Sequence, residues 1–125
     1  MDSGVYIAVF YLPKTQKIRV GKLGQFSFRQ GVYFYVGSAQ RNLSARINRH
    51  GQKNKPLRWH IDYLSTKAEM LGVITIAGPR KHECMLARKL NEIFELAVPG
   101  FGASDCRCGG HLFYAPALAR LGGRA

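Results

Sequence analysis

An arginine and a histidine, Arg46 and His50, stand four residues apart behind a run of small residues at 37–39. This spacing places both side chains on one face of a helix expected over residues 39–50, which Gly51 ends. Small residues between strand and helix let another group approach the backbone closely. A permanent cation beside a titratable ring suits a site that handles phosphate. The alternative is an amphipathic helix with a solvated basic face.

The carboxylate of Glu83 falls in the apolar row of a helix expected over residues 82–96. Glu83 precedes Ala87 by four residues and Leu90 by seven, so it extends the stripe that faces the core. A buried carboxylate needs a partner, commonly a cation or a metal ion. The alternative is an acid in the first helical turn, favoured by the helix dipole and still reached by water.

Two tyrosines, Tyr6 and Tyr35, each lie close to a glycine in an expected strand. If those strands are neighbours, a pair of phenols stands near Arg46 and His50, where it could position or deprotonate a water molecule. The alternative is that both rings belong to the core, because aromatic residues are common in strands.

The cysteines Cys84, Cys106 and Cys108 form an odd and sparse set, which is typical of a reducing compartment. Cys106, Cys108 and His111 could contribute to a zinc site with Cys84 or His82 as the fourth ligand. One residue between two cysteines is tighter than the usual zinc spacing. The alternative is a glycine-rich loop that packs two soft side chains and makes local hydrogen bonds.

Charge is the strongest global feature, with 19 Lys and Arg against 7 acids and a net charge of +12. No acid lies between Asp2 and Asp62. Such a field attracts polyanions, so nucleic acid, and DNA before RNA, is the expected partner. An anionic membrane fits less well because the basic residues alternate with strand-like segments. The candidate nucleic-acid contacts are Arg41, Arg49, Lys53, Lys55 and Arg58.

The length of the chain and its expected strands and helices predict one α/β (α+β) domain over residues 1–125, with a frayed tail from about residue 122. Strands are expected at residues 5–12, 18–20, 26–28, 31–36, 71–77 and 111–114, and helices at 39–50, 57–65 and 82–96. The first strand and that at 31–36 should pair antiparallel, with a hairpin inserted between them. The result is a small antiparallel sheet of three or more strands flanked by helices.

Within the strand at 31–36, Tyr33 and Tyr35 are expected on one face and Phe34 and Val36 on the other. The helix at 82–96 should bury a stripe that includes Leu90 and Ile93. The sequence has no bilayer-length apolar run and no signal-like N-terminus, so a soluble, cytoplasmic protein is expected.

The order of these blocks resembles the GIY-YIG nuclease superfamily. The resemblance rests on Gly4-Val5-Tyr6, Tyr35-Val36-Gly37, Ser38-Ala39, Arg46 and Arg49-His50. A narrower branch, with members that occur alone or fused to endonuclease III-type DNA glycosylases, is similar in further blocks. These are Trp59-His60-Ile61-Asp62-Tyr63-Leu64, Glu83-Cys84, Phe101-Gly102, Asp105-Cys106 and His111-Leu112-Phe113.

The resemblance implies metal-dependent cleavage of DNA phosphodiester bonds in repair or processing, with a repair glycosylase as a candidate partner. Glu83 would hold one divalent cation, Mg²⁺ or Mn²⁺. Arg46 would bind the scissile phosphate. Tyr6 would help activate the attacking water, and Tyr35 would orient it. His50 would assist proton movement or position a tyrosine.

The sequence also departs from the family pattern. Residues 7–34 separate the two motif tyrosines, a longer gap than in typical members, and the inserted hairpin could cover or reshape the site. A late asparagine near the metal has no match, and Ser104 or Asp105 could replace it. A further candidate set comprises His60, Ser104, Asp105 and His111. Two alternatives stay open: a nucleic-acid-binding module without catalysis, and a zinc-stabilised structural protein.

Overall fold

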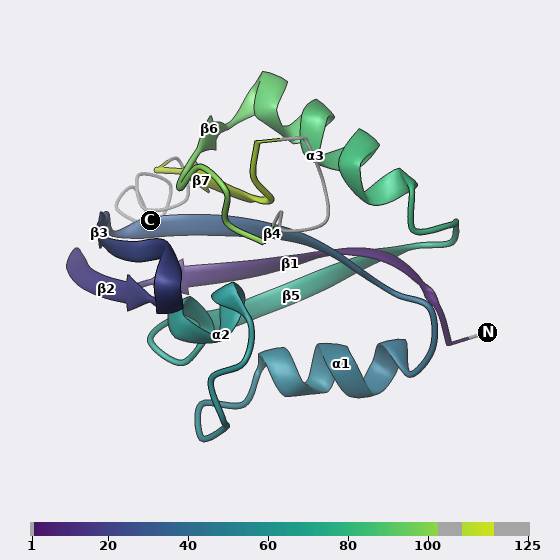
Figure 1. Cartoon of the computed structure of the whole chain (residues 1–125), viewed down its shortest axis with the longest axis horizontal. Helices are drawn as coiled ribbons and strands as arrows, with labels where there is room; N and C mark the ends of the chain where they lie inside the picture. Colours follow the sequence, from purple (N-terminus) through teal and green to yellow (C-terminus); the bar gives the residue numbers. More distant parts are fainter. Residues whose placement is uncertain (1, 103–108, 117–125) are drawn as a thin grey trace, which may run out of the picture.

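A computed structural model describes residues 2–102 and 109–116 and shows an antiparallel sheet between helices (Figure 1). Its five strands lie in the order β5-β1-β4-β7-β6. The strands are β1 (Gly4–Leu12), β4 (Gly31–Ala39), β5 (Glu69–Ile76), β6 (Glu95–Leu96) and β7 (Leu112–Ala115). The helices are α1 (Leu43–His50), α2 (His60–Ser65) and α3 (His82–Ile93). No helix among the described residues is long and apolar enough to cross a membrane.

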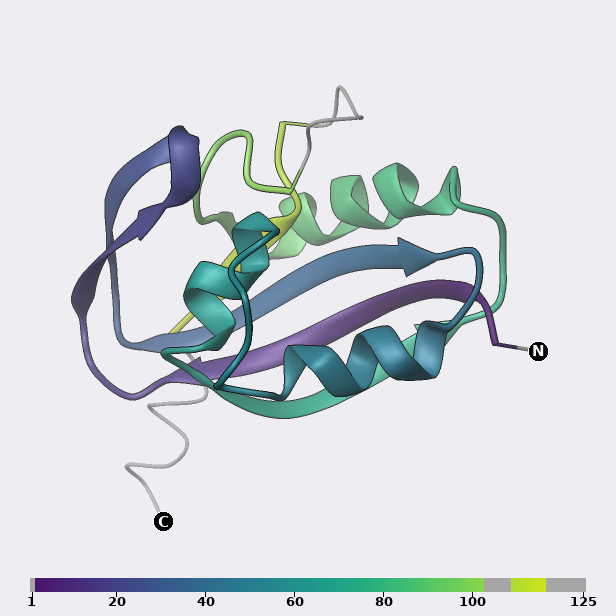
Figure 2. The same ribbon diagram turned by 60° about the horizontal axis from the view of Figure 1, so that its bottom comes forward.

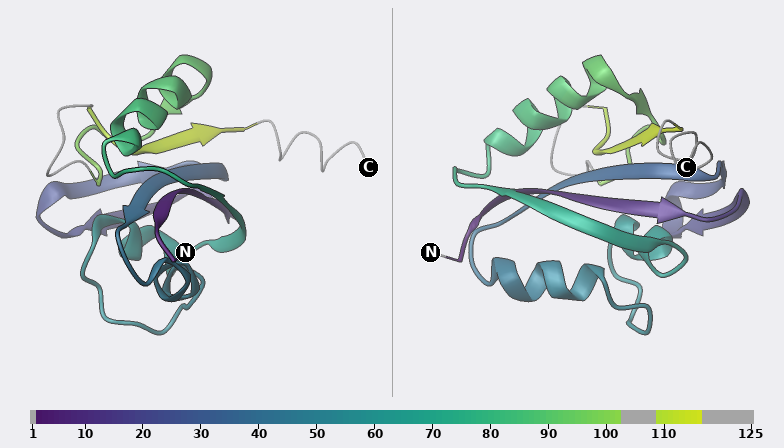
Figure 3. Two further views of the ribbon diagram at one scale, coloured as in Figure 1. Left: turned by 90° about the vertical axis from the view of Figure 1, so that its right-hand side faces the viewer. Right: turned by 180° about the vertical axis from the view of Figure 1, so that it is seen from behind.

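Helix α3 covers one face of the sheet, and α1 and α2 cover the other (Figures 1 and 3). Strands β1 and β4 pair antiparallel along their whole length. Tyr33 and Tyr35 pack in the core on the α1 side, whereas Phe34 and Val36 pack beneath α3. The expected pairing, the alternation of faces and the fold class are therefore confirmed.

The inserted segment folds as a separate hairpin of β2 (Gln16–Val20) and β3 (Gly24–Phe28), joined by the 3-10 turn η1 (Gly21–Leu23). The hairpin lies at one end of the sheet, next to α2 (Figure 2). Its buried residues Ile18 and Val20 join the core on the α1 side. The hairpin was predicted, and it extends this core.

The prediction that a turn and then a helix begin at residues 37–39 is wrong. These small residues continue β4 because each pairs with a residue of β1. The chain turns later, at Asn42, which has a left-handed φ of 57°. Asn42 stands at the N-cap of α1, but its side chain makes no capping hydrogen bond. Asp2 instead accepts hydrogen bonds from the backbone N (2.8 Å) and Oγ (2.7 Å) of Ser44. The end of α1 before Gly51 is confirmed.

The other two predicted helices are shorter than expected. Helix α2 begins at His60, not residue 57, because the Asp62 carboxylate binds the backbone N–H groups of Arg58 and Trp59 and holds them ahead of the helix. Helix α3 ends at Ile93, since the next residue is extended and leads into β6. Ile93 is 71% exposed, so its assignment to the buried stripe is also wrong.

The stripe of α3 can be tested by truncating Leu90 and Ile93 in turn. Leu90 is 8% exposed and packs from α3 against the sheet, so we expect Leu90→Ala to lower the free energy of unfolding by about 2–5 kcal/mol. Ile93→Ala should change it by no more than about 0.5 kcal/mol, because the side chain already faces water. Urea unfolding of both variants measures this difference, and equal losses would contradict the described packing.

Candidate functional site

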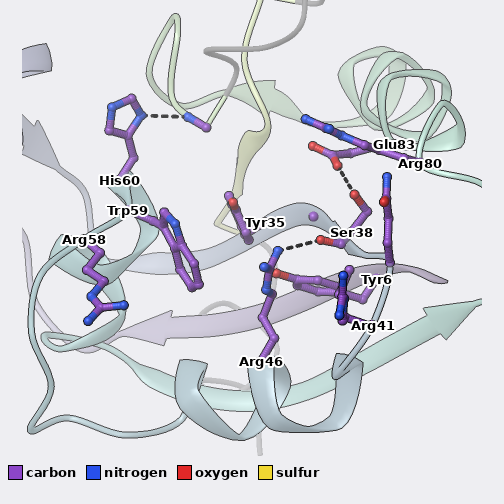
Figure 4. Close-up of a pocket in the computed structure, with 14 residues that line it drawn as sticks. Tyr6, Tyr35, Ser38, Arg41, Arg46, Arg58, Trp59, His60, Arg80 and Glu83 are labelled. Atoms are coloured by element: carbon purple, nitrogen blue, oxygen red, sulfur yellow. Dashed lines mark hydrogen bonds between the residues drawn. The ribbon is translucent and has the colours of Figure 1, made fainter. Parts of the chain in front are cut away.

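A pocket of about 510 Å³ opens beside the end of β4 that β7 leaves uncovered. The ladder between these strands stops at Tyr35. Residues 37–39 of β4 therefore pair with β1 on one edge and border the pocket on the other. Side chains from both faces of the sheet reach this edge (Figure 4). The lining residues are Tyr6, Tyr35, Gly37, Ser38, Ala39, Gln40, Arg41, Arg46, Arg58, Trp59, His60, Arg80, Glu83 and Gly102.

The hydroxyl of Tyr6 lies 2.7 Å from Nε2 of His50, and each residue is only 1% exposed. Burial, and then the positive charge of Lys55, lower the pKa of His50 to about 4, so the imidazole is neutral at pH 7. Burial also raises the pKa of Tyr6, which therefore stays a phenol. A neutral imidazole that is hydrogen-bonded to a phenol can take up the phenolic proton while the phenol oxygen accepts a proton from another molecule.

Gly37 lies opposite Tyr6 in the ladder between β1 and β4. A Cβ atom on Gly37 would stand 2.5 Å from the hydroxyl oxygen of Tyr6 and 2.6 Å from its Cζ atom. The group that approaches the backbone at this run of small residues is therefore the phenol of Tyr6. A glycine is required here by space, since the ring is buried and has nowhere to move.

Arg46 reaches from α1 into the pocket and is fixed on two sides. Its Nη1 donates to the carbonyl oxygen of Ser38 at 2.7 Å, and its Cζ lies 4.8 Å from the centre of the Trp59 ring (Figure 4). The guanidinium is also close enough to Tyr6 for its charge to oppose the rise in the pKa of that phenol. A cation is thus held next to the Tyr6–His50 pair.

Glu83 enters from the opposite side of the sheet and is partly buried. Its Oε1 accepts from Oγ of Ser38 at 2.5 Å, and its Oε2 lies 2.8 Å from Nδ1 of His111. Burial alone raises the pKa of Glu83, but the hydrogen bonds from His111 and Ser38 outweigh it and hold the pKa below its ordinary value. The pocket therefore contains an ionised carboxylate at neutral pH.

A divalent cation in this pocket would have one carboxylate, that of Glu83, as its protein ligand. The described residues contain no group of three or more His, Cys, Asp or Glu side chains that could hold a metal ion. Mg²⁺ and similar ions need only one or two carboxylates, because they keep several water ligands. Glu83 is the one acidic side chain among the described residues that line the pocket, and its oxygens also contact Ser38 and His111.

Cys84 is excluded as the fourth ligand of the hypothetical zinc site, because it is disulfide-bonded and offers no thiolate. The expectation of reduced cysteines does not hold for this residue. Cys106 and Cys108 lie outside the described residues, as do Ser104 and Asp105, the suggested substitutes for the missing asparagine.

Two of the expected nucleic-acid contacts, Arg49 and Lys55, are held within the protein. Arg49 binds the buried Asp62 through both carboxylate oxygens, at 2.7 and 3.0 Å. Nζ of Lys55 donates to the carbonyl of Arg49 at 2.9 Å, and its side chain is 2% exposed. Although burial raises the pKa of Asp62, the hydrogen bonds from Arg49 and two backbone N–H groups keep it lowered. This cluster fastens the segment before α2 to α1.

Some of the remaining predicted residues line the pocket and others do not. Arg41 and Arg58 are exposed and line it, and His60 lines it while its Nδ1 accepts a hydrogen bond from the backbone N of Gly102 at 2.9 Å. Lys53 is exposed but does not line the pocket. His111 lies behind Glu83.

Ser38, Trp59 and Arg80 are among the lining residues to which sequence reasoning gave no role in the site. The alternation of β4 would have placed Ser38 on the α3 face, had the strand been extended through residue 39. No local pattern around Trp59 or Arg80 indicates that either side chain lines the same pocket as Tyr6.

The fold and the pocket define a small mixed α/β domain with a pocket lined by four arginines and one glutamate among the described residues. Residues 5–122 match a family described as domain of unknown function DUF123, and the chain belongs to that family. Neither the curated proteins nor the solved structures contain a match.

The close contact at Gly37 can be tested by adding a methyl group there. We expect Gly37→Ala to lower the free energy of unfolding by about 1–3 kcal/mol, because the new Cβ collides with the buried phenol of Tyr6. Gly72→Ala in β5 of the same sheet is the matched control, since a Cβ at Gly72 would meet no atom within 4 Å. Denaturant unfolding compares the two, and an unchanged Gly37→Ala variant would show that the strand pair leaves room at this position.

The buried His50 should make stability depend on pH. Its pKa is about 4 in the folded chain and about 6.5 when unfolded, so between these values only the unfolded chain takes up the proton. Stability is therefore fully present above pH 6.5 and decreases as the pH falls, by about 3 kcal/mol near pH 4. We expect the loss between pH 7 and pH 4.5, measured with urea, to be smaller in His50→Gln. Equal losses would mean that His50 is not neutral and buried.

Proposed function

We propose that the chain is a divalent-metal-dependent nuclease of the GIY-YIG type, which cleaves phosphodiester bonds of DNA. One observation carries this proposal. Of the five side chains for which the resemblance implies the chemistry, His50 is hydrogen-bonded to Tyr6 and does not line the pocket. The other four come from β1, β4, α1 and α3 and line a single pocket. They are Tyr6, Tyr35, Arg46 and Glu83.

Arg46 is the residue best placed to bind the scissile phosphate. Its planar guanidinium matches two phosphate oxygens and keeps its charge at all working pH values. The contacts with Ser38 and Trp59 orient it before the substrate arrives, which lowers the cost of arranging the site. Arg41 lines the same pocket, so a second cation can contact the strand.

The Tyr6–His50 pair supplies the base. The attacking water would transfer a proton to the hydroxyl oxygen of Tyr6 while the phenolic proton passes to Nε2 of His50, and the new P–O bond forms as the bond to the leaving oxygen breaks. Without this relay Tyr6 would be a poor base, because its pKa is raised by burial. The charge of Arg46 favours electron density on the phenol oxygen. Tyr35, whose pKa burial likewise raises, remains a phenol that can orient the water.

Glu83 would hold the cation, Mg²⁺ or Mn²⁺, which when bound supplies positive charge against the phosphate oxygens. Ser38 and His111 fix the carboxylate so that it faces the pocket. A fixed carboxylate needs no reorganisation as the reaction proceeds.

A second candidate function is DNA binding without cleavage, as a module that delivers a repair partner. Both carboxylate oxygens of Glu83 already have partners within the protein, which favours this reading. The arginines of the pocket and the net charge of +12 suffice for salt-sensitive binding.

Cleavage of DNA with Mg²⁺ or Mn²⁺ separates the two candidates. We expect the wild type to cut at least one of three substrates, single-stranded, nicked or branched DNA, and Glu83→Gln to lose about 100-fold or more in rate because the cation site is lost. Gel analysis of labelled strands measures the rates.

Glu92→Gln removes an exposed charge from the same helix and is the matched control, which should cut like the wild type. Absence of cutting with either ion, or equal cutting by Glu83→Gln, contradicts the nuclease proposal. Salt-sensitive binding in the absence of cutting supports the second candidate instead.

A further inference from the structure

The pocket has two chemically different ends. Arg41, Arg80 and Glu83 surround the end near Ser38, whereas the indole of Trp59 lies toward the other end, beyond Arg46 (Figure 4). Trp59 is 38% exposed and belongs to neither hydrophobic core. A large aromatic side chain that the core does not use, on the wall of a polar pocket, is available to a ligand.

The protein fixes this indole firmly. The buried carboxylate of Asp62 accepts a hydrogen bond from the backbone N of Trp59 at 2.9 Å, so the residue is held in an extended conformation just before α2. The guanidinium groups of Arg46 and Arg49 lie over the ring, with Cζ at 4.8 and 4.5 Å from its centre. The aromatic surface and the phosphate-binding cation are thus one preorganised unit.

We propose that Trp59 forms a subsite for an unpaired nucleobase of the strand whose phosphate Arg46 binds. Base stacking on aromatic side chains is the common way in which proteins hold single-stranded nucleic acid, and it tolerates any base. The proposal rests on the proposed function and narrows its substrate to DNA that presents an unstacked nucleotide beside the scissile phosphate.

The size of the pocket favours an unpaired base. A base inside a duplex has both faces covered by its neighbours and cannot stack on a side chain without leaving the helix. A cavity of about 510 Å³ is of the size that holds a small ligand, and a whole duplex cannot enter it. A single-stranded or junction nucleotide reaches Trp59 without the cost of unpairing.

Trp59 is the single tryptophan of the sequence, so intrinsic fluorescence reports on this subsite alone. The protein is titrated in EDTA, which prevents metal-dependent cleavage, with a labelled single strand, with the same strand carrying abasic sites, and with a blunt paired duplex. Label anisotropy measures binding in the same samples. We expect the base-bearing strand to quench Trp59, and the abasic strand and the duplex to bind without comparable quenching.

The contribution of Trp59 to the affinity for each strand is measured with variants. We expect Trp59→Ala to bind the base-bearing strand about tenfold more weakly and the abasic strand much less so, because the abasic strand loses only the orientation of Arg46 by the indole. Trp59→Phe should retain most of the affinity. Leu57→Ala, an exposed apolar truncation in the same segment outside the pocket, should leave both affinities unchanged.

Equal quenching by the base-bearing and abasic strands overturns the subsite. So does an equal loss of both affinities in Trp59→Ala, which would show that Trp59 only positions Arg46. Quenching in a protein that does not cut supports the subsite and contradicts the nuclease, whereas cutting without quenching does the reverse. If no strand binds, both proposals fail.

Discussion

The buried hydroxyl of Tyr6 is the contact on which the pocket depends. It lies against the backbone of Gly37 on one side and against Nε2 of His50 on the other. The first contact requires the present register of β1 and β4, because a shift of one residue would move Tyr6 to the face beneath α3. The contact with Nε2 requires that α1 place His50 against Tyr6. One phenol therefore ties the central strand pair to the first helix.

Basic residues that look alike in the sequence have different tasks in the fold. Arg49 and Lys55 surround the buried carboxylate of Asp62 and fasten a loop, whereas Arg41 and Arg46 line the pocket. A buried acid without these partners would be costly, so the cluster stabilises itself and also sets the place of Trp59. The net positive charge thus serves partly for the internal structure and partly for the pocket.

Much of the fold was predictable because local pattern and long-range packing agree. The β-branched and aromatic residues of β1 and β4 alternate correctly, and the pairing of the two strands followed from that. The pattern failed where small residues were taken for a turn, because cross-strand pairing of Gly37 and Ser38 decides their conformation. It failed again at Ile93, where the helix leaves the sheet before the apolar row ends.

The candidate site was predictable only in part, for a related reason. Glu83 was singled out as an acid in an apolar row, and the structure places it in the pocket beside Ser38. The role of Asp62 depends on contacts with residues of another helix and loop, and no spacing within the sequence reveals them. Local sequence patterns thus identify residues that are unusual for their position, such as an acid in an apolar row. The partners of these residues can be identified only from the folded structure.

The most direct test of the account is the single-turnover rate of DNA cleavage by Tyr6→Phe in the presence of Mn²⁺. This change removes only the hydroxyl and keeps the packed ring, so the account predicts a loss of about 100- to 10,000-fold in rate with DNA affinity unchanged. Tyr33→Phe, which removes another buried hydroxyl on the same face, should cleave like the wild type. A Tyr6→Phe variant that cleaves at the wild-type rate would contradict the central role of this contact.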